Sequence, residues 1–137
     1  LAGTDELPIR PAGTGSERYG GLGELSYPAM LDYLRHCRTY LYTGTQPASY
    51  TLGLMEAMLS GVPVVSIGPA GMWMPDLFEG HDLTRIWSDD PAEVRRLLAM
   101  FLTDDDLAAV ASAAMRERAL ELFDIAHVGP AWLRFLG

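Results

Sequence analysis

Residues 39–67, TYLYTGTQPASYTLGLMEAMLSGVPVVSI, contain the strongest secondary-structure signals of the chain. Residues 39–43 are mostly aromatic or β-branched and end at a glycine, which predicts a strand. Ser49 then caps a predicted helix over about residues 50–60. Residues 62–67 form an almost continuous apolar run, typical of a strand buried on both faces of a parallel sheet. A strand, a helix and a second strand with short connections predict a βαβ unit.

The segment before this unit predicts a loop and a helix. Residues 10–23 are rich in glycine, so we predict a loop there, with at most a short strand near Tyr19–Leu22. Ser26 offers an N-cap, and apolar residues at helical spacing predict a helix over about 27–36. Residues 1–3 resemble the tail of a strand.

The segment after the unit predicts a strand followed by a helix. Thr84–Trp87 predicts a short strand, and a helical turn is expected before it around Pro75–Glu79. Asp90 and Pro91 mark a helix start, since they supply a cap and a proline at the first helical position. The expected apolar stripe of this helix is Val94, Leu97, Leu98, Phe101 and Leu102.

Two further helices are predicted near the C-terminus. Thr103 caps the first of them, and Asp124 opens the second, which extends over Ile125–Leu136 and should bend at Pro130. The residues expected to face inward from the first are Leu107, Val110, Ala111, Ala114 and Leu122.

These elements together predict an α/β fold. We expect a three-layer, Rossmann-like open parallel sheet with helices on both faces, missing its first strand and helix. Residues 1–137 are expected to form a single domain, truncated at its N-terminus, with 124–137 as a closing helix.

Composition supports a globular domain and excludes several functions. Of the 137 residues, 49% are hydrophobic and 20% charged, which suits a chain with a real core. The net charge is −8 and the ten basic residues, all arginines, are scattered, so no nucleic-acid partner is expected. A single cysteine, Cys37, excludes an internal disulfide and a multi-cysteine zinc site. The lack of disulfides favours a cytoplasmic location.

Glu56 is the first candidate binding residue. It falls within the predicted helical stripe of Leu52, Met55 and Leu59, where a carboxylate is costly unless it has a partner. A sugar diol is a suitable partner, because one carboxylate can accept hydrogen bonds from two adjacent hydroxyls. The alternative is that Glu56 lies at the edge of the face and reaches water, or caps a loop amide.

The start of the same helix is the second candidate. It follows the carboxyl end of the strand over 39–43, which is where open α/β sheets bind ligands. Amides of Tyr50, Thr51 and Leu52 would point at a phosphate there, and the hydroxyls of Ser49 and Thr51 could add donors. The alternative is that Ser49 serves only as a helix cap.

The residues Tyr50-Thr-Leu-Gly-Leu-Met-Glu-Ala-Met58, followed by Gly61-Val-Pro-Val-Val65, resemble the donor-site helix and next strand of retaining GT-B glycosyltransferases of family four. The resemblance implies two Rossmann-like halves, of which the second binds a nucleotide sugar. It implies that Glu56 holds the ribose hydroxyls and that the amides at 50–52 receive the pyrophosphate. The family's other hallmark glutamate, which contacts the transferred sugar, would fall at Ala48.

Weaker similarities follow in the same order along the chain. Gly23-Glu-Leu-Ser-Tyr27 resembles the turn near which the family binds the base, which implies roles for Gly23 and Leu25. The residues 75–80 resemble a loop helix of the family. The residues 122–125, with Trp132, resemble the helix that crosses back to the first half.

The resemblance implies a hexosyltransferase-type enzyme that moves a sugar from an NDP-sugar to an acceptor hydroxyl with retention. It implies no cofactor and no metal, and no catalytic residue in this chain. The acceptor-binding N-terminal half would be the missing partner, so this chain alone is expected to be inactive and to meet a membrane only through that half. The alternatives are a non-catalytic nucleotide-sugar-binding module and a flavodoxin-like interaction domain without a sugar ligand. An exposed sheet edge adds the hypothesis of a homodimer.

Overall fold

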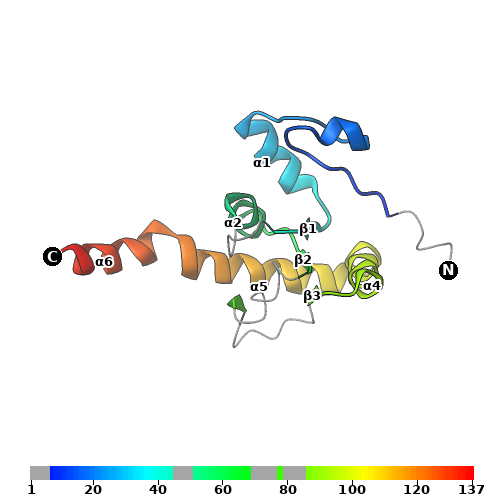
Figure 1. The fold of residues 1–137 in the computed structure, drawn as a ribbon. Helices are drawn as coiled ribbons and strands as arrows, with labels where there is room; N and C mark the ends of the chain where they lie inside the picture. The colour runs from blue at the N-terminus through cyan, green and yellow to red at the C-terminus, as the bar shows by residue number, and fades with distance from the viewer. Residues whose placement is uncertain (1–6, 45–50, 69–76, 79–85) are drawn as a thin grey trace.

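The computed structural model describes residues 7–44, 51–68, 77–78 and 86–137. Its three strands are β1 (Tyr40–Tyr42), β2 (Val64–Ile67) and β3 (Trp87–Ser88), in the order β1-β2-β3. Both neighbouring pairs are parallel, and helices flank the sheet (Figure 1). The predicted class is therefore confirmed: the chain is an α/β protein with a small open parallel sheet of Rossmann-like type.

The helices in chain order are η1 (Ser16–Tyr19, a 3-10 helix), α1 (Tyr27–His36), α2 (Leu52–Leu59), α4 (Pro91–Thr103), α5 (Asp105–Phe123) and α6 (Ile125–Leu136). In Figure 1, α1 and α2 lie on the same side of the strands. Helix α5 passes alongside the strands, and α6 extends from the end of α5 away from them. The core shared by these elements contains Leu34, Tyr42, Leu54, Ala57, Met58, Val64, Val65, Val94, Leu97, Leu98, Phe101, Ala111, Met115 and Ala119.

The N-terminal loop folds without the short strand predicted near Tyr19–Leu22. Residues 16–19 form η1 instead, because Gly15 and Gly20 on either side take left-handed backbone conformations with φ of 81° and 73°. The Leu22 amide donates to the Pro11 carbonyl at 2.9 Å, which closes the loop across its base. The loop is therefore held by this hydrogen bond and by the turn of η1, and not by strand pairing.

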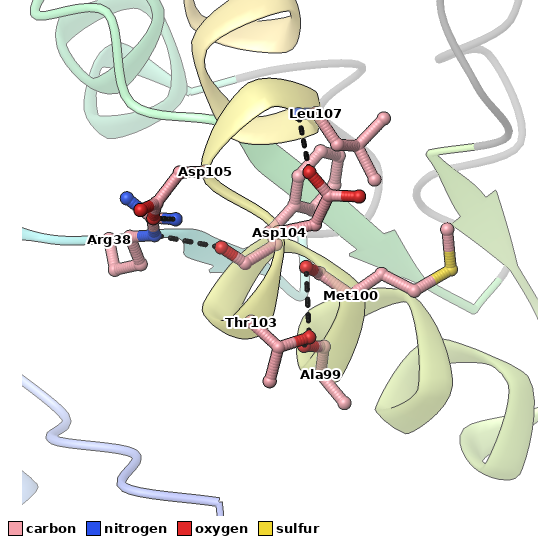
Figure 2. Close-up of polar contacts among 8 residues, drawn as sticks. Arg38, Ala99, Met100, Thr103, Asp104, Asp105 and Leu107 are labelled. Atoms are coloured by element: carbon pink, nitrogen blue, oxygen red, sulfur yellow. Dashed lines mark hydrogen bonds and ion pairs between the residues drawn. The ribbon is translucent and has the colours of Figure 1, made fainter.

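The caps of two helices differ from the predicted ones. Asp104 caps α5 by accepting from the Leu107 amide at 2.9 Å, whereas Thr103 ends α4 and donates back to the Ala99 carbonyl (Figure 2). Asp90 caps α4 as predicted. Ser26 occupies the N-cap position of α1, but its side chain accepts no hydrogen bond from the helix.

The buried face of α5 is made of small residues and one methionine: Ala108, Ala111, Met115 and Ala119. Alanines at this spacing let the helix approach its neighbours closely. Val110 was predicted to face inward, which is wrong, since 59% of it is exposed. It lies one residue from Ala111 and therefore about 100° around the helix from the buried face.

The linker between α1 and β1 is tied to the corner between α4 and α5 (Figure 2). The Arg38 guanidinium donates from Nε to the Phe101 carbonyl at 2.8 Å and forms an ion pair with Asp105. Phe101 is in the last turn of α4, where carbonyls have no partner within the helix. A cation at a helix C-terminus also interacts favourably with the helix dipole.

Replacing Arg38 by glutamine should lower the free energy of unfolding by about 1 kcal/mol, because the Phe101 carbonyl loses its donor. Asp105→Asn is the matched change, and we expect it to cost less than about 0.5 kcal/mol, since an exposed ion pair contributes little. Urea titration of both variants measures the difference. Equal losses would show that the ion pair, and not the bond to Phe101, holds the corner.

The last helix has an apolar surface that this chain leaves exposed. Asp124 caps α6 by accepting from the Ala126 amide at 2.8 Å, and the helix continues through Pro130 to Leu136. No residue of α6 is buried; the most exposed apolar ones are Ile125, Leu133, Phe135 and Leu136. Among the helices that the structure describes, none has the length and apolar character needed to span a bilayer.

Candidate functional site

The core-facing side of α2 is not the one expected from the sequence. Leu54, Ala57 and Met58 are fully buried, at the i, i+3, i+4 spacing of one helical face. The predicted stripe of Leu52, Met55 and Leu59 is therefore wrong: Leu52 is 74% and Leu59 is 36% exposed. Both faces have helical spacing, so periodicity alone could not choose between them. Glu56 lies outside the core and is half-buried.

The beginning of α2 is joined to the carboxyl end of β1. Thr51 is the N-cap, and its hydroxyl oxygen accepts from the Leu54 amide at 3.4 Å. Burial raises the pKa of Tyr42, and the nearby Thr51 partly offsets the effect. Since Tyr42 pairs with Ser66 of β2, the helix starts beside the carboxyl ends of two parallel strands. Open α/β sheets bind ligands at this edge.

A second phenol lies under the exposed side of α2. A methyl group added at Gly53 would stand 3.4 Å from the Tyr40 hydroxyl, so α2 and Tyr40 approach closely there. The pKa of Tyr40 is raised, first by burial and then by the nearby ionisable groups Tyr42 and Glu56. Gly53 and Glu56 are three residues apart and share a helical face. The Tyr40 phenol and the Glu56 carboxylate therefore belong to one polar cluster.

Glu56 also lines an open pocket of about 350 Å³ between α1, α2 and α5. The lining residues are Tyr27, Leu31 and Arg35 of α1, Glu56, Leu59 and Ser60 at the end of α2, and Arg116 of α5. The α1 residues follow at four-residue spacing and form one side of the groove. No ion pair or side-chain hydrogen bond joins Glu56 to any residue that the structure describes. Its oxygens can therefore accept from a ligand's hydroxyl groups.

The glycine-rich loop places the two residues predicted near the base. Gly23 is buried with φ of 73°, and its amide donates to the Ser16 hydroxyl at 2.9 Å. Leu25 is half-buried in the turn that leads into α1. Tyr27 begins that helix, lines the pocket and is 63% exposed. The loop thus leads to the groove that contains Glu56.

The structure describes only some of the remaining predicted site residues. Ser49 and Tyr50 lie outside the described residues, as does Ala48. Thr51 is the helix cap and Leu52 the first helical residue, so these two stand at the helix start as predicted. In the chain segments that the structure describes, no three His, Cys, Asp or Glu side chains gather as metal ligands.

Several residues at the site were not singled out from the sequence. Tyr40 and Tyr42 alternate along β1, and that spacing places both phenols on one face of the sheet. Arg35 and Arg116 are 81 positions apart in the sequence, so only the packing of α5 against α2 brings them to one pocket. No short motif could have paired them.

Comparison with known proteins identifies the family. A family model described as glycosyl transferase-like matches residues 2–134, almost the whole chain. Searches among curated proteins and among solved structures found no match. The match covers the sheet, the groove and the helices described above, with α6 included as far as Arg134. This chain therefore belongs to the glycosyl transferase-like family.

Proposed function

We propose that this chain is the donor-binding half of a retaining GT-B glycosyltransferase, which takes a sugar from an NDP-sugar and passes it to an acceptor hydroxyl. The observation that carries the proposal is the position of Glu56. It is a half-buried carboxylate with no partner among the described residues, and it faces a groove from α2, the helix that starts at the carboxyl edge of the sheet. Vicinal hydroxyls of a ribose suit that carboxylate, because each can donate to one of its oxygens.

The other parts of the donor would lie around Glu56. The pyrophosphate would meet the amides of Tyr50, Thr51 and Leu52, because the first amides of a helix have no partner within it and carry the positive end of the helix dipole. The base would lie near the turn containing Gly23 and Leu25, next to the exposed ring of Tyr27. An aromatic ring offers a stacking surface of the kind nucleobases use.

The apolar surface of α6 fits the two-domain arrangement. Its apolar side chains are exposed here, and burying them against the acceptor-binding half would remove them from water. The reacting atoms of the acceptor would then come from that half. This chain alone would bind the donor and transfer nothing.

A non-catalytic nucleotide-sugar-binding module is a second candidate, because Ala48 stands where the resemblance implies a glutamate that contacts the sugar. It predicts the same binding of the nucleotide with little preference for the sugar. A flavodoxin-like interaction domain would instead pair Glu56 internally, and within the described residues it has no such pair.

The test is calorimetric titration of UDP, GDP and ADP, free and as sugar conjugates, into the chain and into Glu56→Ala. We expect one base to bind, and the variant to bind it at least roughly tenfold more weakly, because hydrogen bonds to a charged group are lost. Glu117→Ala is the control, since it removes the same charge from an exposed position of α5. Equal weakening in both variants, or no binding of any nucleotide, would contradict the proposal.

A further inference from the structure

The pocket between α1, α2 and α5 contains two cations that the donor role does not use. Arg35 and Arg116 both line it, together with the single carboxylate of Glu56. The chain as a whole carries a net charge of −8, so the charge of this pocket lining is opposite in sign to that of the whole chain. Two guanidinium groups against one carboxylate leave the lining positive.

Within the described part of the chain, no carboxylate neutralises either arginine. Asp32, one helical turn before Arg35, is paired with His36, and the ion pairs of the described residues include neither Arg35 nor Arg116. By contrast, Arg38, Arg96 and Arg118 each have a carboxylate partner. A guanidinium carries five N–H donors in a planar fork, which matches the oxygens of a phosphate.

The stem of Arg116 lies beside the turn after α2. Gly61 has φ of 77°, and a methyl group added there would stand 3.8 Å from Cδ of Arg116 and 3.1 Å from Oγ of Ser112. The Ser112 hydroxyl also donates to the Gly61 carbonyl. The stem of Arg116 therefore lies over a glycine, one residue from Ser60 of the pocket. Arg116 is exposed, so its guanidinium is accessible to a ligand in the pocket.

We propose that this groove binds a phosphomonoester carried by a small polyol, with Arg35 and Arg116 on the phosphate and Glu56 on the hydroxyls. A volume of about 350 Å³ suits a small ligand and not a macromolecular surface. The phosphate site lies beside the second half of α2, whereas the donor role puts its phosphates at the start of that helix. The proposal shares with that role Glu56 and the groove that Tyr27 lines, but not the site of the phosphates.

The experiment is a ¹H–¹⁵N titration of the chain with inorganic phosphate and, separately, with ribose 5-phosphate, at constant ionic strength. We expect saturable shifts at Ser60 and Arg116, and tighter binding of ribose 5-phosphate. Arg35→Gln with Arg116→Gln should weaken both ligands by roughly tenfold. Arg18→Gln with Arg134→Gln is the matched control, because it removes the same charge from exposed positions outside the pocket.

Each outcome of this titration either supports the phosphate-site proposal or overturns it. No saturable shift at the pocket, or equal weakening in the control, would overturn the proposal. Glu56→Gln should abolish the advantage of ribose 5-phosphate without weakening the binding of inorganic phosphate, because it removes the hydroxyl acceptor and a negative charge. Equal affinity of the unmodified chain for the two ligands would overturn the polyol part. If the double arginine variant still binds the nucleotide, the phosphate site is distinct from the donor site. The donor proposal and the phosphate proposal can then fail independently of each other.

Discussion

Replacing Met115 by alanine should lower the free energy of unfolding by about 3–5 kcal/mol, which is a large part of the stability of a domain this size. Met115 is fully buried, so truncation removes its packing and leaves a cavity in the centre of the core. Its sulfur also accepts a hydrogen bond from the Val64 amide at 3.0 Å. The variant would therefore leave a buried amide at the start of β2 without an acceptor.

The position of the Val64 amide explains why the Met115 sulfur is its hydrogen-bond acceptor. Ser66 and Gly68 donate to the carbonyls of Ile86 and Ser88 on the β3 side of the sheet. The Val64 amide is two residues earlier and so points to the same side, where Met115 receives it. The side chain thus takes the place of a strand neighbour.

Met115→Leu separates the two contributions, because it keeps the volume and removes only the acceptor. We expect it to cost about 1–2 kcal/mol. Met100→Leu is the control: its sulfur accepts from the exposed Arg96 guanidinium, which water can satisfy instead, so a change of less than about 0.5 kcal/mol is expected. Urea unfolding measures all three. A cost for Met115→Leu no larger than that of Met100→Leu would show that the N–H···S contact contributes nothing.

Gly21→Ala should disrupt the loop that leads to the groove. A Cβ atom on Gly21 would collide with the Pro11 carbonyl oxygen and lie 2.7 Å from the Ser16 hydroxyl oxygen. Both atoms are held: Pro11 accepts from the Leu22 amide, and Ser16 accepts from the Gly23 amide. The backbone must therefore shift, at a cost of about 1–3 kcal/mol.

The loss should be local, since residues 11–23 contribute little to the core. Hydrogen exchange at the Leu22 and Gly23 amides is expected to speed up while exchange in β2 stays unchanged. Gly129→Ala is the matched control, because that glycine lies inside α6 with room for a methyl group, and alanine favours a helix by about 1 kcal/mol. Protected loop amides in Gly21→Ala would contradict the clash.

The sequence predicted the order of elements well because strong local signals mark them. Asp90 and Pro91 start α4 where predicted, and the apolar run at 62–67 contains β2. Helix starts were less certain where two capping residues stood close together. Thr103 and Asp104 both suit an N-cap, and the carboxylate took the position while the threonine bonded back into α4.

The candidate site was predicted in part. Glu56 was singled out by a predicted apolar stripe and by a motif. The stripe is wrong, because Leu52 and Leu54 both begin a helical apolar pattern and only the second faces the core. Arg35 and Arg116 were missed, since residues so far apart meet only through the packing of α5. Tertiary contacts of that kind leave no local trace in the sequence.

The ties between the sheet and α5 also set the order in which the chain can fold during synthesis. The hydrogen-bond partners of Gly61 and Val64 are each synthesised 51 residues later. Arg38 likewise precedes its partners Phe101 and Asp105. At roughly 5–20 residues per second on the ribosome, a gap of about 50 residues lasts roughly 3–10 s. During that time the nascent βαβ unit cannot complete its hydrogen bonds, so the domain closes only after α5 has been synthesised.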